Sequence, residues 1–219
     1  NRSILSSVAK VSGGEGIRIK PVGMHTKAEW TIQMSAIYSS LTRSNLTTAY
    51  LSNGTGGEFY TRISSTAGIQ VKNGRDGDDT WTQIPLQAGK WLHITYVHKD
   101  KKTTVYVNGK VQKVFENSAI TFGENSMIVV GNSGYRNDYL REIRLWDKAL
   151  TESEINDYLY LPMDPATPHL ISYLPLSKEM ETKDLKAPAG TENVTTKARI
   201  EYVENVKFPA DELVIVNQE

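Results

Sequence analysis

Hydrophobic and polar residues alternate with a period of two along much of the chain. Residues 30–38, WTIQMSAIY, place apolar side chains at every second position from Trp30 to Tyr38, with the polar residues Thr31, Gln33 and Ser35 between the first of them. Residues 91–98, WLHITYVH, place Leu92, Ile94 and Tyr96 on one face. Because successive side chains of a β-strand point to opposite faces, this period predicts strands rather than helices.

An Asn-Gly pair at 108–109 separates two strand-like runs, TTVYV at 103–107 and KVQKVF at 110–115. Asn-Gly favours the tight turns with positive φ that join adjacent antiparallel strands, so we expect a hairpin here. Further strands are expected at 17–19, 46–51, 58–63, 68–71, 80–85, 127–131, 139–146, 170–175 and 199–203.

Turn-forming residues gather between these runs, at 12–16, 52–57, 73–79 and 131–138. Many short strands separated by turns at short intervals are typical of an all-β sandwich or barrel. The pattern therefore predicts an all-β fold.

One short segment predicts a helix. Thr151 and Glu154 have the spacing of a capping box, in which each side chain accepts a hydrogen bond from the other residue's backbone N–H. Ile155, Tyr158 and Leu159 follow with helical spacing and can pack one face onto the sandwich. Such a short helix depends on this packing for its stability.

The pattern changes after residue 161. Prolines at 162, 165 and 168 indicate an extended linker, and the polar stretch 178–197 reads as a long loop. The last 58 residues, 162–219, hold too few apolar residues to form a core of their own. We therefore expect a sandwich over 1–161 and an extension over 162–219 that adds strands to it or packs on it.

Charge and composition argue against several classes of function. The 219 residues include 25 basic and 25 acidic residues, and this balance lacks the positive field of a non-specific nucleic-acid binder. No apolar run is long enough to span a membrane as a helix, so we expect no membrane insertion by this chain. There is no cysteine, which excludes disulfides and thiolate chemistry. Residue 1 is Asn, so we expect sequence upstream of it.

Four segments together resemble the laminin-G-like, concanavalin A-like jelly-roll domains. They are, in the family's order, AEWTIQM at 28–34, GKWLHITYV at 89–97 with TTVYVNGK at 103–110, SMIVVGNS at 126–133, and REIRLWDKALTESEI at 141–155. The resemblance covers residues 1–161 and implies a two-sheet antiparallel β-sandwich with one short helix. It also implies that a late core strand ends at the rim, where the helical turn packs beside it.

The sequence departs from the family pattern at two positions. Asp138 stands where a Gly is usual, and Arg141 where an Asp is usual. The tail resembles a segment that follows this domain in secreted Bacteroides-type surface proteins. This likeness implies an extracellular or cell-surface location, including that of a lipid-anchored bacterial protein.

Some relatives with this fold are glucanases, which carry E-x-D-x-x-E on one strand. Alternate carboxylates on a strand point into the same cleft and can act as nucleophile and acid. The nearest string here, Glu152, Glu154 and Asp157, lies on the predicted helix, where residues two apart point in different directions. We therefore expect a protein that is not an enzyme.

Candidate ligand-binding residues fall into two groups. Aromatic faces flanked by hydrogen-bonding side chains bind sugars, and loops at the rim of a rigid fold commonly carry such sites. Trp30, Trp91 and Trp146 lie at positions that the resemblance assigns to the core or its margin. The first group of candidates is Tyr60, Arg62, Arg75, Asp76 and Trp81, and the second is Tyr135, Arg136, Asn137 and Asp138. An ordinary exposed loop is the alternative reading for each group.

The loop NGRDGDD at 73–79 offers carboxylate oxygens from Asp76, Asp78 and Asp79. These could bind Ca²⁺, but the full order of a calcium loop is missing, and a hairpin turn rich in Gly, Asn and Asp explains the same residues. We favour the turn and expect no cofactor.

The leading hypothesis is a non-catalytic module that binds a glycan or polysaccharide. A structural or adhesion module, which contacts an upstream domain or a protein partner without a sugar site, is the alternative. An enzyme with an unfamiliar set of catalytic residues is the third.

Overall fold

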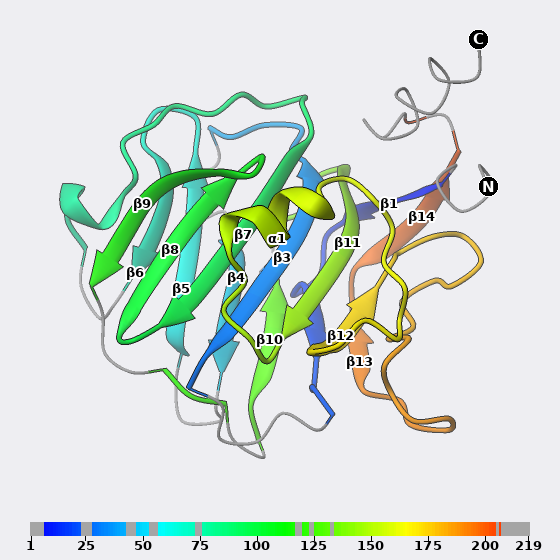
Figure 1. Cartoon of the computed structure of the whole chain (residues 1–219). Helices are drawn as coiled ribbons and strands as arrows, with labels where there is room; N and C mark the ends of the chain where they lie inside the picture. Colours follow the sequence, from blue (N-terminus) through cyan, green and yellow to red (C-terminus); the bar gives the residue numbers. More distant parts are fainter. Residues whose placement is uncertain are drawn as a thin grey trace, which may run out of the picture.

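The computed structural model describes residues 7–22, 28–42, 47–52, 57–72, 76–116, 120–122, 125–131, 134–204 and 206. Two antiparallel sheets pack face to face in a sandwich, with one short α-helix on its outside (Figure 1). The predicted all-β jelly-roll class with one short helix is confirmed.

The larger sheet has eight strands, and its central strands are those with the strongest alternation in the sequence. Their order is β14 (Arg199–Val203), β1 (Val8–Ser12), β11 (Asp138–Trp146), β3 (Trp30–Ile37), β7 (Leu92–Lys99), β8 (Lys102–Val107) and β9 (Lys110–Glu116). The eighth strand, β12 (Leu170–Leu174), pairs with the second half of β11, whereas β1 pairs with its first half.

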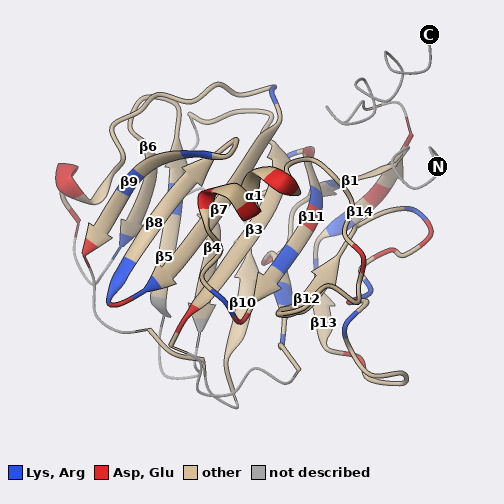
Figure 2. Ribbon diagram, in the orientation of Figure 1, with Lys and Arg blue, Asp and Glu red and all other residues tan. Residues whose placement is uncertain are grey.

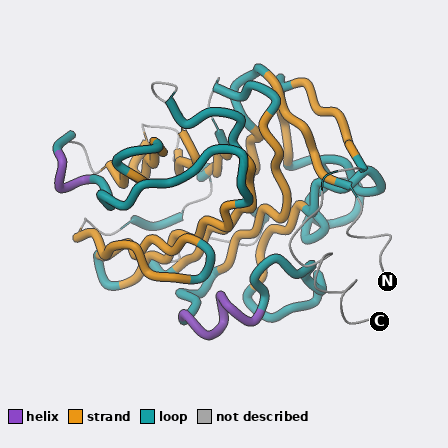
Figure 3. Tube along the Cα trace, turned by 90° about the horizontal axis from the view of Figure 1, so that it is seen from above, coloured by secondary structure: helices purple, strands orange, loops and turns teal. Residues whose placement is uncertain are grey.

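The smaller sheet has six strands and lies behind the larger one in Figure 1. Their order is β13 (Val194–Thr196), β2 (Ile17–Ile19), β10 (Met127–Val130), β4 (Thr47–Ser52), β5 (Gly57–Ser64) and β6 (Gly68–Lys72). Seen from above in Figure 3, α1 (Glu152–Asp157) lies on the outer side of the strand layers.

The core lies between the sheets, and Trp30 is fully buried in it. Its ring packs edge-on against Phe59, with centroids 5.0 Å apart, and stacks on His98 at 5.1 Å. The indole N–H donates to the carbonyl of Ile120 at 2.9 Å. Trp30 thus joins both sheets, and a buried donor is satisfied, as burial requires.

The expected hairpin at Asn108-Gly109 joins β8 to β9. Asn108 has φ 52° and Gly109 has φ 78°, the two positive values that a type I′ turn requires. The Asn108 side chain also accepts a hydrogen bond from the backbone N–H of His93 at 2.8 Å. The turn residue therefore also ties the hairpin to β7.

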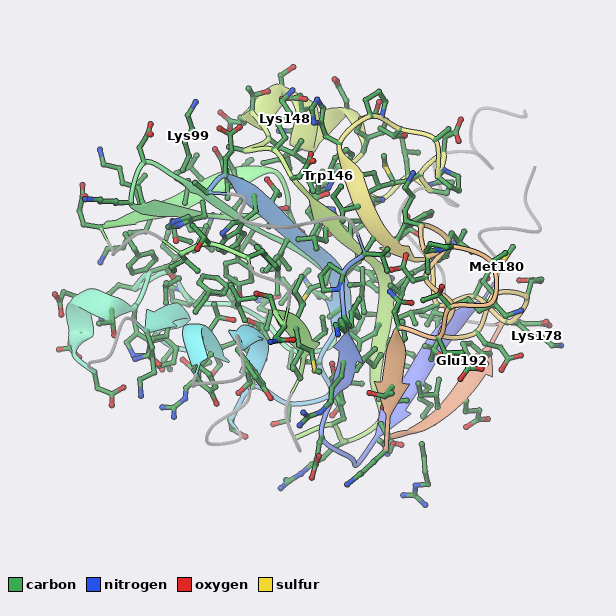
Figure 4. All side chains as sticks on the ribbon, turned by 90° about the horizontal axis from the view of Figure 1, so that it is seen from below. Lys99, Trp146, Lys148, Lys178, Met180 and Glu192 are labelled. Atoms are coloured by element: carbon green, nitrogen blue, oxygen red, sulfur yellow. The ribbon has the colours of Figure 1, made fainter. Side chains whose placement is uncertain are left out.

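The capping box predicted at the helix start is present. The Thr151 hydroxyl accepts from the Glu154 N–H, and the Glu154 carboxylate accepts from the Thr151 N–H. Ile155 is buried against the outer face of the larger sheet, whereas Tyr158, after the last helical residue, is 37% exposed. In Figure 4 the side chain of Trp146 lies between this sheet and the segment that carries α1.

The three described strands after residue 161 extend both sheets. β12 pairs with β11, β14 pairs with β1, and β13 pairs with β2. In Figure 4, Lys178, Met180 and Glu192 lie at the side of the sandwich, on the long connection between β12 and β13. No helix among the described residues is both long enough and apolar enough to span a membrane.

The structure differs from the sequence prediction at 80–85. This segment runs along β6 with one isolated bridge, between Gln70 and Trp81, and forms no strand. Thr82 accepts the Ile69 N–H through its side chain, and Gln83 has φ 59°, so regular pairing stops. Two strands that the sequence did not predict, β1 and β13, are also present.

Candidate ligand-binding site

A row of polar and aromatic side chains crosses the outer face of the smaller sheet. Thr47 of β4 is paired with Arg62 of β5, Arg62 with Gln70 of β6, and Gln70 with Trp81. Residues paired across adjacent strands share a face. This face is the outer one, because Arg62 alternates with Thr61 and Ile63, which are buried toward the core.

A second row runs beside the first. Tyr60 is paired with Tyr50 on one side and with Lys72 on the other. The two tyrosine rings are stacked, with centroids 5.8 Å apart, and the Arg62 guanidinium lies 5.5 Å from the centroid of the Tyr60 ring. We call the seven residues of this face the platform: Tyr50, Tyr60, Arg62, Gln70, Lys72, Asp76 and Trp81.

The acidic member of the platform is tied to its neighbours. Lys72 donates to the Asp76 carboxylate at 3.2 Å, and the Gln70 amide donates to it at 3.2 Å. The hydrogen bond from Lys72 is the main cause that lowers the pKa of Asp76, followed by Gln70, with Arg62 adding a smaller electrostatic effect. Asp76 therefore stays ionised and holds Lys72 and Gln70 in place.

Two side chains, Gln70 and Lys113, hold the Trp81 segment against the sheets. Gln70 donates to the Thr80 hydroxyl at 2.9 Å from the β6 side. From the larger sheet, the Lys113 ammonium donates to the carbonyls of Asp79 at 2.8 Å and of Trp81 at 3.2 Å. In Figure 2 the short red turn at the left-hand edge is η2 (Asp78–Thr80), so this segment lies at the rim of the sandwich.

The structure brings together four residues of the first predicted group: Tyr60, Arg62, Asp76 and Trp81. Arg75, the fifth, lies outside the described residues. Three platform residues, Tyr50, Gln70 and Lys72, were not predicted from the sequence. The period of two indicates them, because each directly follows a residue that points into the core: Ala49 precedes Tyr50, Ile69 precedes Gln70 and Val71 precedes Lys72.

The second predicted group does not form an exposed aromatic rim. Tyr135 is only 4% exposed, because its ring covers Gly131 and its hydroxyl donates to the Val130 carbonyl at 2.9 Å. Asp138 is fully buried and accepts from the N–H groups of Ser39 and Arg136. The prediction that Tyr135 and Asp138 present exposed side chains to a ligand is wrong.

Arg136 and Asn137, the other members of this group, are exposed in the turn before β11. The Asn137 side chain accepts a hydrogen bond from the Ser12 hydroxyl at 2.8 Å. These contacts fix the turn against β1.

A calcium site at Asp76, Asp78 and Asp79 stays a prediction. Over the described ranges, no group of three or more Asp, Glu or His side chains is placed to hold a metal ion. Asp76 uses its carboxylate on Lys72 and Gln70. The contacts shown by the loop are therefore those of a structured turn.

A second group of polar side chains lies on the outer face of the larger sheet, where the chain after α1 buries it. Glu142 and Arg144 form an ion pair at 2.8 Å, with side chains 1% and 0% exposed, and the Tyr173 hydroxyl donates to Glu142. Arg144 also donates to the carbonyls of Tyr158 and Leu161. The chain after α1 therefore covers this face, whereas the platform lies on the opposite outer face of the sandwich.

His93 lies on the same covered face and is fully buried, with its ring packed edge-on against Tyr160 at 5.7 Å. Burial is the main cause that lowers the pKa of His93 to about 3, and the positive charge of Arg144 is the second. His93 is therefore neutral at physiological pH.

Comparison with known proteins agrees with this architecture. Residues 12–156 match the family model described as the concanavalin A-like lectin/glucanases superfamily. No curated protein matches the chain. A proposed carbohydrate-binding protein from Bacteroides ovatus has a similar structure, with a TM-score of 0.70 at 19% sequence identity over 93% of this chain. The match spans 61% of the Bacteroides protein.

A heptameric SAP-like pentraxin from Limulus polyphemus is also similar, with a TM-score of 0.60 and 13% identity. That match covers 92% of this chain and 96% of the pentraxin. At such identities the two structures show a shared fold. With the family model matched over residues 12–156, the chain belongs to the concanavalin A-like lectin/glucanases superfamily, as a laminin-G-like domain.

Proposed function

We propose that this chain is a non-catalytic module that binds a glycan through the platform, as part of an extracellular or cell-surface protein. The observation that carries the proposal is the arrangement of Tyr60 and Trp81. Both are partly exposed on one outer face, in adjacent rows that also contain Arg62, Gln70 and Lys72.

This arrangement suits a sugar because a pyranose ring has an apolar C–H face and an edge of hydroxyl groups. Aromatic side chains can cover the apolar face, and a few polar groups fix the orientation of the hydroxyls. Trp81 and Tyr60 provide aromatic surface at two places on the platform. Arg62, which is paired with Gln70 across β5 and β6, provides hydrogen-bond donors between them.

The charges of the platform favour binding over hydrolysis. Glycosidases use two carboxyl groups, about 5 to 9.5 Å apart, as acid and as nucleophile or base. Asp76 is the one carboxylate among the seven platform residues, and Lys72 lowers its pKa. A residue held in the ionised form is a poor general acid.

The likeness to the proposed carbohydrate-binding protein from Bacteroides ovatus supports the same assignment. So does membership of a superfamily whose description includes lectins. The tail sequence that resembles Bacteroides-type surface proteins supports an extracellular location.

A glycan array tests the proposal, with Ca²⁺ and with EDTA, using the wild type, Trp81→Ala and Tyr158→Ala. Tyr158 is a matched control, because it is a partly exposed aromatic residue on the opposite outer face. We expect the wild type and Tyr158→Ala to bind the same glycans, and Trp81→Ala to bind at least about tenfold more weakly. Loss of binding in EDTA would support the calcium hypothesis. A blank array with folded protein would overturn the proposal and favour the adhesion module.

A further inference from the structure

Arg62 forms no salt bridge with a carboxylate of the described residues, although its charge contributes to the lowered pKa of Asp76. Its guanidinium lies over the Tyr60 ring, and its Nε–H is buried without a hydrogen-bond acceptor among the described residues. Other platform groups are engaged, since Lys72 and Gln70 donate to Asp76. Arg62 is partly exposed, so the part of its guanidinium that reaches the surface can donate to an acceptor that a ligand supplies.

Arg62 is held in place on the platform. Lys72 forms an ion pair with Asp76, which leaves Arg62 as a platform cation without a salt bridge among the described residues. The Tyr60 ring beneath the guanidinium restricts its motion and keeps water from one of its faces. An anion at Arg62 would therefore meet a pre-oriented guanidinium.

Resting on the proposed function, we propose that the glycan recognised by the platform is acidic, and that Arg62 binds the carboxylate of a uronic-acid residue. The guanidinium is a planar fork whose N–H groups match the two oxygens of a carboxylate. The uronic-acid carboxylate lies on the edge of the pyranose ring. Arg62 can thus hold this edge while the aromatic surface of the platform covers the face of the ring.

The test compares uronate oligosaccharides with the same oligosaccharides after reduction of each carboxyl group to an alcohol. Galacturonan, glucuronan, alginate and hyaluronan fragments are titrated by calorimetry into the wild type, Arg62→Gln, Arg62→Lys and Arg136→Gln. Arg136 is a matched control, because it is an exposed arginine outside the platform. Thermal melting of each variant checks that it is folded.

The wild type and Arg136→Gln should bind at least one uronate oligosaccharide about tenfold or more tightly than its reduced form, as expected for a charge-assisted hydrogen bond. In Arg62→Gln this preference should fall to about one, with the weaker binding of the reduced form retained. Arg62→Lys should recover part of the preference, because it keeps the charge but loses the fork.

Three outcomes would overturn the inference. If Trp81-dependent binding is seen only with neutral glycans, the proposed function stands and the uronate assignment is wrong. The same holds if binding requires sulfate esters in place of carboxylates. If no glycan of any kind binds to the folded wild type, both the proposed function and the inference fail.

Discussion

The Lys113 ammonium of β9 donates a hydrogen bond to the main-chain carbonyl of Trp81 at 3.2 Å, and so links the larger sheet to the platform on the smaller one. It also donates to the Asp79 carbonyl at 2.8 Å. Lys113 therefore acts as a positioning residue for Trp81.

Lys113→Met should weaken glycan binding about three- to tenfold. The Trp81 segment loses two hydrogen bonds that hold it in place, so ordering it on binding costs conformational entropy. The free energy of unfolding should fall by less than about 1.5 kcal/mol, which is what one or two exposed hydrogen bonds contribute. Lys110→Met, an exposed residue at the start of the same strand, is the control and should leave affinity unchanged. Equal affinity in Lys113→Met and the wild type would refute the positioning role.

The contributions of Glu142 and Arg144, which form a buried ion pair, to the free energy of unfolding should depend strongly on each other. Glu142→Gln leaves the Arg144 charge buried without a counter-ion, and such a loss costs about 3 to 5 kcal/mol. We expect the free energy of unfolding, measured by urea denaturation, to fall by that amount.

A double-mutant cycle with Arg144→Met isolates the pair. The double variant should be less destabilised than the sum of the two single variants by at least about 1.5 kcal/mol. Strictly additive changes would show that the pair contributes nothing beyond its separate contacts.

His93 should make the protein less stable in mild acid. Its pKa in the folded state is about 3, below the value near 6.5 of an unfolded chain, so the unfolded state takes up a proton first as the pH falls. Stability is fully present above pH 6.5 and is lost below it, by about 1.4 kcal/mol per pH unit for this group. Burial also lowers the pKa of His98, which acts in the same direction.

Urea denaturation at pH 7 and pH 5 measures this effect. The wild type should lose about 2 kcal/mol or more between the two values, since pH 5 lies about 1.5 units below the unfolded pKa. His93→Gln should lose about 2 kcal/mol less over the same interval, even if it is less stable at pH 7. An unchanged dependence on pH in His93→Gln would contradict the assignment.

Local patterns in the sequence predicted most of the central fold. Alternation identified β3 and β7 in the middle of the larger sheet. Asn108-Gly109 identified the hairpin, because its turn requires positive φ at both residues. The short strand β1 was missed, since five residues with little alternation become a strand only by pairing with β11 and with β14, which is far along the chain.

The site was predicted only in part, for a physical reason. Trp81, Tyr60 and Arg62 stood out by residue type, but their common face depends on register between strands. Tyr135 looked exposed because it lies in a loop rich in Gly and Asn. Its ring instead fills the space above Gly131, where a Cβ atom would come within 2.2 Å of the ring, and no local pattern reveals such a contact.

The central claim, that the platform binds a glycan, is tested most directly by the indole N–H signals of the four tryptophans in an NMR titration. Trp30 and Trp146 are buried, with their indole N–H groups bonded to the Ile120 carbonyl and to Gln33. Trp81→Phe assigns the Trp81 signal. Addition of the glycan with the highest affinity on the array should shift the Trp81 signal and leave those of Trp30 and Trp146 in place. A saturated complex in which the Trp81 signal does not move would contradict the account.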